Sequence, residues 1–462
     1  MEPEAQEIRR KFLALVWPVI IQNFLFMLMF HIDTAMVGRL PEHLMPEVSL
    51  AAMGIIGPVR WAINLFMMGV CIGTVATVAQ SVGEKNFKKA ETYAAASYLV
   101  ASVLGVAGTI VINLLAFRIT GLFIDDPYVV YEGGNYLRIT FLFFCFQYAT
   151  LIGASILRAA GDTRTPMIIT GISNILNIFG NYTLIFGKFG FPALGLYGAA
   201  ISTGICKMFE GIVMTFFIFS KKSILPLHLK SFDRVTKDII RKLLKVSIPA
   251  SIEPFFVNSG FLMFTKIVAS LGTFAIAANR VALAVEALSF MPGHAFAAAC
   301  ATIVGHKMGE RSSRGVHLAV KQSLKVAMLT MGGIACLFLI IPHYLANIFT
   351  DDKDIIYTAA FCLIIGALEQ PFIGICQILK GTFHGLGDTK SPIYIGAAGT
   401  WIPRVILSYL LGHYYGLGLA GVWIATTCDW ILRSSLYYLV YRRKKKKKFG
   451  ISTNGGSGGV VI

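Results

Sequence analysis

The sequence predicts an all-α polytopic membrane protein with about twelve transmembrane helices, arranged as two related lobes of six helices each. The chain has 462 residues, of which 56% are hydrophobic and only 14% are charged. A single soluble core cannot bury so large an apolar fraction, so lipid must cover part of it. Apolar runs of about 20 residues, long enough to cross a hydrocarbon core of about 30 Å, recur along the chain. Short motifs also return at a constant distance, which indicates an internal repeat.

The apolar runs define the expected spans. The first run is too long for a secretory signal and lacks a small-residue cleavage pattern, so we expect it to be retained as a helix. Eight cysteines are scattered through the runs without a Cys-x-x-Cys pair, and we therefore expect no cofactor and no metal beyond a coupling sodium ion. The spans are expected at 12–37, 51–79, 92–116, 135–157, 166–186, 197–219, 243–270, 276–303, 321–348, 358–380, 392–413 and 418–441.

The basic residues are distributed unevenly between the two sides of the expected bundle. The net charge is +17, and nearly all the lysines and arginines between spans fall in alternate connections. Positive residues are retained on the cytoplasmic side, so we expect both termini in the cytoplasm of a multi-pass protein in a plasma or inner membrane. This distribution indicates contact with a lipid bilayer and argues against binding nucleic acid.

Three motifs occur once in each half. Arg158-Ala-Ala-Gly-Asp162-Thr-Arg-Thr-Pro166 returns as His384-Gly-Leu-Gly-Asp388-Thr-Lys-Ser-Pro392, 226 residues later. The other two pairs are Ser81-Val-Gly83-Glu-Lys85 with Ile303-Val-Gly305-His-Lys307, and Trp17-Pro18 with Ile248-Pro249. Both halves would have the same orientation, related by a pseudo-two-fold axis along the membrane normal. The expected divisions are a cytoplasmic N-terminus (1–11), an N-lobe (12–219), a cytoplasmic loop (220–242), a C-lobe (243–441) and a basic, then flexible tail (442–462).

A paired-bundle repeat has a physical use. Two similar bundles that face each other can enclose a cavity that opens first to one side of the membrane and then to the other. The repeat therefore favours a transporter over a receptor or an anchored enzyme.

Several segments resemble the multidrug and toxic compound extrusion (MATE) family. They are Ile32-Asp33-Thr-Ala-Met-Val-Gly38, Leu157–Met167, Ile248-Pro-Ala-Ser-Ile-Glu253, Leu288-Ser-Phe-Met-Pro-Gly293 and Gly387-Asp-Thr-Lys-Ser-Pro. The similarity extends from about residue 12 to about residue 440. The resemblance implies two six-helix lobes and a monomer that exports small organic cations or drugs in exchange for a proton or sodium ion.

The N-lobe carries a polar face inside its expected spans. A charge near the centre of a bilayer costs about 3 to more than 10 kcal/mol, so Asp33 requires a partner or a function. Gln22 lies near the same face of its helix, and Asn174, Asn177 and Asn181 share one face of the fifth span. Counting along the helices puts Asp33, Asn181 and Thr203 at similar depth, where they could hold a proton or sodium. The competing interpretation is that the amides only link helices.

The resemblance extends to individual residues. It implies that Asp33, Asn177 and Thr203 match a cation site in the N-lobe, and that Glu253 matches a glutamate used in cation coupling. Asn181 departs from a common version of the pattern, which has an aspartate there, and this favours a proton over sodium. Glu253 is expected near mid-membrane, where a low dielectric would raise its pKa and let it exchange a proton.

The remaining embedded charges favour structural roles. Lys207 can pair with Glu210, and Asp429 with Arg433, because their spacings of three and four residues bring them together on one helix. Arg404 is expected to join Asp429. Glu286 and Glu369 have no local partner and, with Gln22, are candidates for the substrate cavity.

Three other functions compete with a cation-coupled antiporter. A lipid-linked oligosaccharide flippase would share the architecture but would need a strongly basic cavity. An intramembrane enzyme lacks support, because the sequence has no Gly-x-Ser-x-Gly, no His-Glu-x-x-His and no paired catalytic aspartates. An ion channel would call for a central ring of identical residues that two lobes do not supply.

Overall fold

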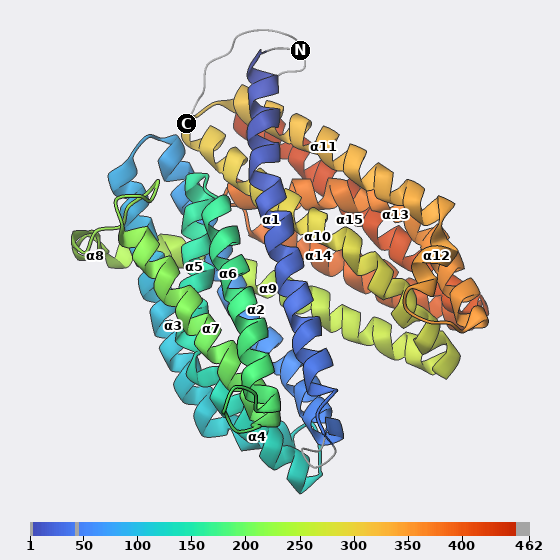
Figure 1. Cartoon of the computed structure of the whole chain (residues 1–462). Helices are drawn as coiled ribbons and strands as arrows, with labels where there is room; N and C mark the ends of the chain where they lie inside the picture. The colour runs from blue at the N-terminus through green and yellow to red at the C-terminus, as the bar shows by residue number, and fades with distance from the viewer. Residues whose placement is uncertain (1–2, 42–45, 450–462) are drawn as a thin grey trace. The chain divides into compact units, whose positions relative to one another are not determined.

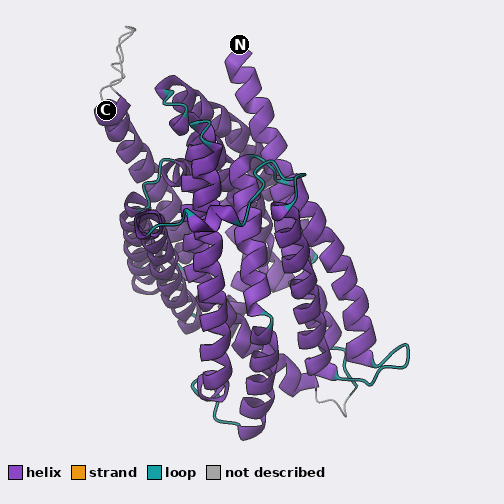
Figure 2. Ribbon diagram, turned by 90° about the vertical axis from the view of Figure 1, so that its left-hand side faces the viewer, coloured by secondary structure: helices purple, strands orange, loops and turns teal. Residues whose placement is uncertain are grey.

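The computed structural model describes residues 3–41 and 46–449, and over these residues it contains helices and no strand (Figure 2). The helices are α1 (Pro3–Val37), α2 (Pro46–Gly83), α3 (Phe87–Gly121), α4 (Pro127–Leu142), α5 (Phe144–Ala160), α6 (Arg164–Phe186), α7 (Gly195–Phe219), α8 (Lys230–Asp233), α9 (Lys237–Ser270), α10 (Thr273–Gly309), α11 (Ser313–Ile340), α12 (Pro342–Asn347), α13 (Lys353–Gly385), α14 (Lys390–Gly399) and α15 (Gly418–Phe449). Two π-helical segments, Thr400–Leu407 and Leu410–Tyr414, continue α14.

The long helices follow the expected order of spans. Among the described residues, ten helices are long and apolar enough to cross a membrane, and the bent pair of α4 and α5 makes up to eleven. The α15 helix occupies the place of the last expected span. The all-α class with ten to twelve apolar helices is therefore confirmed, and the connecting helices α8 and α12 are too short to span.

Two expected spans are interrupted. The span expected at 135–157 is bent by 48° where α4 meets α5, around Phe143. The span expected at 392–413 changes from α to π geometry at Thr400, close to Pro403. Proline has no N–H to donate and its ring clashes with the preceding turn, and such sites commonly carry wider helical turns. The start of α1 also differs, because the helix begins at Pro3 and so includes most of the segment expected as a polar N-terminus.

The chain divides into two compact units, which we describe separately. The N-unit contains Trp17–Val82 and Asn86–Ser251, and the C-unit contains Met1–Val16, Gly83–Lys85 and Ile252–Ile462. The α1 and α9 helices each contribute to both units, and each changes unit within three residues of its repeated proline, Pro18 or Pro249. Of the expected flexible tail, 450–462 lie outside the described residues.

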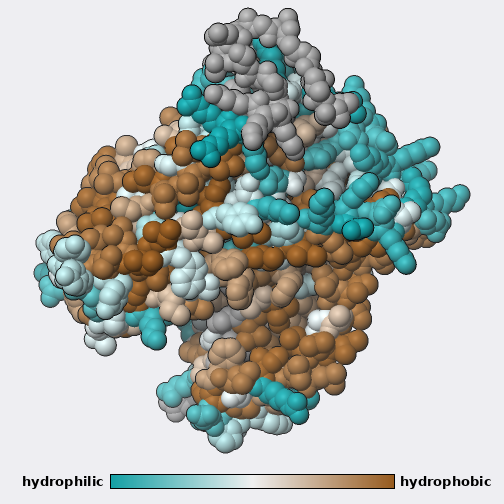
Figure 3. Space-filling model, turned by 180° about the vertical axis from the view of Figure 1, so that it is seen from behind, coloured by the Kyte–Doolittle hydropathy of each residue, from teal (hydrophilic) through white to brown (hydrophobic). Residues whose placement is uncertain are grey.

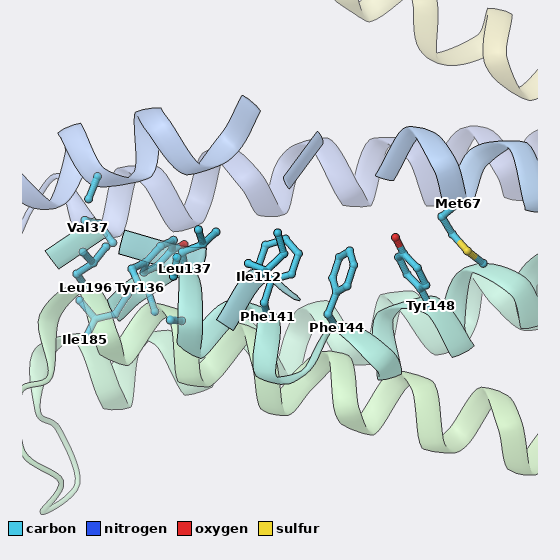
Figure 4. Packing of buried hydrophobic residues seen from close by; sticks show 14 of the residues in the cluster. Val37, Met67, Ile112, Tyr136, Leu137, Phe141, Phe144, Tyr148, Ile185 and Leu196 are labelled. Atoms are coloured by element: carbon cyan, nitrogen blue, oxygen red, sulfur yellow. The ribbon is translucent and has the colours of Figure 1, made fainter. Parts of the chain in front are cut away.

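The core of the N-unit is built around the bend between α4 and α5. Figure 4 shows Phe141, Phe144 and Tyr148 in a row along the two helices, facing Met67 of α2. The ring centroids of Phe141 and Phe144 are 4.3 Å apart, and those of Phe144 and Tyr148 are 4.4 Å apart. Aromatic pairs at this distance add to the burial of their apolar area. The row holds α4 and α5 against α3 and α7, which lie beside them in Figure 1.

The C-unit is organised around α13. This helix packs against α10, α11 and α15, and α15 packs against α14 and its π-helical continuation. Many of the buried residues of α13 are small, including Gly374, Gly381 and Gly385. A side chain at Gly381 would lie 2.2 Å from the backbone oxygen of Ala297 on α10, so only glycine permits this approach of the two helices.

The repeated Gly-Asp motif forms the same turn in both halves. Gly161 has φ +100° and Gly387 has φ +74°, and each ends a helix in the left-handed conformation. The following carboxylates cap the next helix, because Asp162 Oδ1 accepts from the backbone N–H of Arg164 and Thr165, and Asp388 Oδ1 from that of Ser391. The motif therefore fixes the turn between the fourth and fifth spans of each half.

Large apolar side chains remain exposed along the outer faces of the helices. Leu114, Phe216 and Leu329 are 74%, 78% and 82% exposed, and Figure 3 shows broad brown areas of such side chains on the face that it presents. Soluble monomers rarely expose apolar surface on this scale, and these faces are consistent with a multi-pass membrane protein.

Candidate functional site

The embedded carboxylate of α1 is held by an amide of α6. Asn181 Nδ2 donates to Asp33 Oδ1 at 2.5 Å. Asp33 is half-buried, and Asn181 is fully buried. The two residues therefore meet as expected from their depth.

A polar row along α6 positions this contact. Thr170, Asn174, Asn177 and Asn181 follow one another at helical spacing and are all buried. Asn177 Nδ2 lies 3.3 Å from Thr203 Oγ1 and 3.2 Å from Ser202 Oγ, both on α7. Asn174 Nδ2 donates instead to the backbone oxygen of Leu25 at 2.9 Å, so its amide links α6 to α1.

Asp33 lines a small cavity. The cavity has a volume of about 90 Å³, and Asn174, Asn177, Thr203 and Lys207 also line it. A second cavity of about 160 Å³ shares Thr203 and Lys207 with the first. Sites for drug-sized ligands usually have volumes of about 300 to 1,000 Å³, so this space suits an ion or a few water molecules.

Two amide oxygens near Asp33 lack a hydrogen-bond partner within the part of the chain that the structure describes: that of Asn177, which lines the cavity, and that of Asn181, whose Nδ2 contacts Asp33. The side-chain oxygens of Asn177 and Asn181 are buried, and neither accepts a hydrogen bond from the described residues. A buried polar atom without a partner costs about 1 to 3 kcal/mol. Two such oxygens beside a carboxylate therefore form a place where a proton or a cation would be stabilised.

Positive side chains face the same space. Arg60 and Lys207 both line the cavity, and the Lys207 ammonium lies 5.0 Å from the ring centroid of Phe26. Lys207 Nζ also lies 2.6 Å from Glu210 Oε2, which is the pair expected from their spacing. Glu210 therefore offsets one of the two cations.

Gln22 belongs to a buried hydrogen-bond network that includes Glu210, the partner of Lys207. Its Nε2 donates to Thr170 Oγ1 at 3.1 Å, and Thr170 Oγ1 donates to Glu210 Oε1 at 2.7 Å. Gln22 is 2% exposed. Its assignment to the substrate cavity remains a prediction, and its observed contacts are those of a residue that links α1, α6 and α7.

The structure corrects the expected environment of Glu253. Lys380 Nζ lies 2.7 Å from Glu253 Oε1, and His384 Nε2 lies 3.8 Å from Oε2. The sequence predicts a low dielectric around Glu253 and names no partner for it, whereas in the structure an ammonium and an imidazole face the carboxylate. Lys380 and His384 are one helical turn apart on α13, and that spacing was the signal available in the sequence.

The other embedded charges gather in the C-unit. Asp429 Oδ2 lies 2.8 Å from Arg404 Nε, and Asp429 also pairs with Arg433, whose Nη2 donates to Thr400 Oγ1 at 2.7 Å. This triad joins the π-helical segment to α15.

Glu286 and Glu369 lie next to each other, and the positive charge of Arg404 is near enough to attract both carboxylates. Glu369 is fully buried, and neither of its carboxylate oxygens has a hydrogen-bond partner among the described residues. The structure therefore shows the two glutamates as interior groups of the C-unit, and their role in a substrate cavity stays a prediction.

Sequence reasoning missed two contributors to the N-unit site. Arg60 of α2 lines the Asp33 cavity, and its spacing in the sequence does not relate it to Asp33. Thr170 was detectable, because it precedes Asn174 by four residues and so extends the polar row by one turn.

A family comparison matches most of the chain. The model of the MatE family matches residues 18–183 and 249–410. The two matched segments correspond to the two halves of the repeat.

Individual relatives match over nearly the full length. A protein named probable multidrug resistance protein NorM from Thermotoga maritima is 30% identical, over 97% of this chain and 96% of that protein. An uncharacterized transporter, YisQ from Bacillus subtilis, is 27% identical over 95% of each chain.

Solved structures share the fold. A multidrug resistance MATE family transporter of the MOP superfamily, in an outward-facing conformation, matches with a TM-score of 0.87 at 21% identity and covers 97% of this chain and 99% of that one. A MOP superfamily transporter from Pyrococcus furiosus matches with a TM-score of 0.85 at 21% identity, over 96% and 98% of the two chains. The chain therefore belongs to the MatE family, a family of membrane transporters and not of enzymes.

Proposed function

We propose that the protein is a proton-coupled antiporter that exports small amphiphilic organic cations by alternating access. The observation that carries the proposal is the Asp33 cavity, where a carboxylate contacts an amide and two buried amide oxygens lack partners. The name of the Thermotoga maritima relative, a probable multidrug resistance protein, supports the class of cargo.

The charge balance of the cavity favours a proton over sodium. Arg60 and Lys207 face the same space as Asp33, and Glu210 pairs with only one of them. Asp33 and Glu210 together balance the two cations, so the cavity has no net negative charge to hold a sodium ion, whereas a proton bonds covalently to one oxygen of the Asp33 carboxylate. Sodium stays the competing choice, to be decided by experiment.

Coupling requires that the proton favour one conformation of the transporter. An ion that binds both conformations equally shifts neither, however tightly it binds. We infer that a proton entering from outside neutralises the Asp33 carboxylate and weakens the hydrogen bond that it accepts from Asn181. This change would favour the state that releases cargo. The orientation follows the charge distribution, with both termini in the cytoplasm.

The flippase alternative fits the cavity less well. A pyrophosphate would need a site that is basic throughout. The cations at the Asp33 cavity are accompanied by Asp33 itself and by Glu210. Transport of a lipid-linked pyrophosphate by the purified protein would favour that alternative.

The test is transport by purified protein in liposomes at a clamped membrane potential. The uptake of ethidium is measured under a proton gradient alone and then under a sodium gradient alone. We expect the proton gradient to drive uptake and the sodium gradient to leave it at the background rate. D33N should lose the driven component, and D351N, which makes the same change on an exposed loop, should keep it. Driven transport by D33N at the wild-type rate would overturn the proposal.

A further inference from the structure

A groove on the C-unit lies over α13, between α11 and α15. Its volume is about 620 Å³, and Leu379 of α13, Tyr438 and Tyr441 of α15, and several residues of α11 line it. The α13 helix packs against both neighbours and so forms the floor. The groove lies within one unit and contains none of the residues of the Asp33 site.

One ridge of α11 gives this groove a polar end and an apolar end. His317, Lys321, Lys325 and Leu329 follow one another at intervals of four residues, so they lie in a single row along the helix. The first three carry nitrogen and the fourth is apolar. Leu324 and Met328 line the groove beside the same row and extend its apolar surface.

The lysines lie where a bare charge is unfavourable. Lys321 and Lys325 are exposed, and the expected hydrocarbon span of this helix starts at residue 321, so Lys325 lies about 6 Å inside it. Farther along α11, Leu329 is 82% exposed and Ile340 is 76% exposed, as expected for a face in contact with acyl chains. Lysines at such a depth extend toward the interface and are stabilised by an anionic group.

We propose that this groove binds one anionic phospholipid, with the phosphate on Lys321 and Lys325 and an acyl chain along Leu324, Met328 and Leu329. The amphiphilic row matches a phospholipid in both chemistry and order, because the cations precede the apolar residues along the helix. Basic pockets between transmembrane helices are known to hold phosphate headgroups in this way. The positive charge disfavours an organic cation, so the groove is not a second site for the cargo. The inference does not depend on the proposed function.

The experiment measures lipid binding by the full chain in detergent. Purified protein is titrated with dioleoylphosphatidylglycerol or dioleoylphosphatidylcholine, and binding is followed by native mass spectrometry and by the rise in melting temperature. We expect the anionic lipid to bind at least five-fold more tightly than the zwitterionic lipid. K321Q/K325Q should remove most of this preference, whereas K321R/K325R should retain it.

Two controls separate this site from general effects of charge. K237Q/K242Q removes two exposed lysines elsewhere and should keep the preference of the wild type. Inorganic phosphate at the same concentration should give no rise in melting temperature, because it lacks the acyl chain. An unchanged preference in K321Q/K325Q, with its melting temperature in phosphatidylcholine intact, would overturn the proposal, as would a full effect of phosphate alone.

Discussion

Lys380 Nζ lies 2.7 Å from Glu253 Oε1, so one of the two carboxylates expected to carry a coupling ion already has a cationic partner. Asp33, in contrast, contacts the neutral amide of Asn181. A carboxylate that faces an ammonium is neutralised without taking up another ion, whereas one that faces amides is not. We therefore propose Asp33 as the stronger of the two candidates.

The pair of Glu253 and Lys380 predicts a specific pattern of stability. The side chains of Glu253 and Lys380 are 4% and 28% exposed, so K380M would leave a buried carboxylate without its ammonium. Breaking a buried ion pair from one side costs about 3 to 5 kcal/mol, whereas replacing both partners is often tolerated. We expect K380M to lower the melting temperature in detergent and E253Q/K380M to recover most of the loss. The double variant should also keep proton-driven transport, and its loss would assign Glu253 a direct part in coupling.

Asn181 predicts how the ion preference could be changed. N181D would place a second carboxylate against Asp33, since the two side chains are in direct contact at 2.5 Å. Two adjacent carboxylates with amide and hydroxyl oxygens nearby form a better site for sodium than one does. We expect N181D to gain a rise in melting temperature with sodium chloride over choline chloride that the wild type lacks. N181L should show no such gain, and an equal response of N181D and wild type would contradict the prediction.

The packing of Phe143 against Gly204 predicts the effect of adding a side chain at that glycine. A side chain at Gly204 on α7 would lie 2.1 Å from Cδ2 of the Phe143 ring, whereas one at Gly171 would meet only Leu25, at 3.7 Å. Overpacking of an interior costs about 1 to 3 kcal/mol. We expect G204A to lower the melting temperature and G171A to leave it nearly unchanged. F143A should restore part of the loss in G204A, and equal melting temperatures for G204A and G171A would contradict this account.

The sequence was sufficient for the features that repeat or follow helical spacing. The order of the spans, the Gly-Asp turns at Gly161 and Gly387, and the polar face of α6 all depend on local periodicity, which a single sequence contains. The short pair of Lys207 and Glu210 follows from the same spacing.

Contacts between segments that are distant in the sequence were harder to predict. The bend at Phe143 occurs without proline or glycine at that residue, and the Phe143 ring packs against Gly204 of α7, 61 residues away in the chain. The partner of Glu253 lies 127 residues away in the chain, on α13. Helix periodicity orients a side chain but does not identify the helix it faces, so the sequence alone names no partner for Glu253.

The turn at Asp388 predicts a dependence of stability on pH. Burial alone would raise the pKa of Asp388, but hydrogen bonds from Lys444 and Ser391 outweigh it and lower the pKa below the ordinary value of 3.8. Lys444 of α15 contacts Asp388 Oδ2 and also lies 2.9 Å from Ser391 Oγ. The contact therefore connects the turn to the basic end of the last helix.

A carboxyl group whose pKa is lowered by folding stabilises the folded state above its unfolded pKa, and this contribution is lost as the pH falls through the folded pKa. We expect D388N and K444Q to lower the melting temperature equally from pH 8 to pH 5, and the difference from wild type to shrink as the pH falls below about 3.8 and to vanish below the lowered pKa of the folded state. D162N is the matched control, because Asp162 Oδ1 accepts from the backbone N–H groups of Arg164 and Thr165 and asparagine keeps that acceptor. A loss in D388N that does not shrink as the pH falls below about 3.8 would show that the side-chain shape at this turn, and not the ion pair with Lys444, stabilises it.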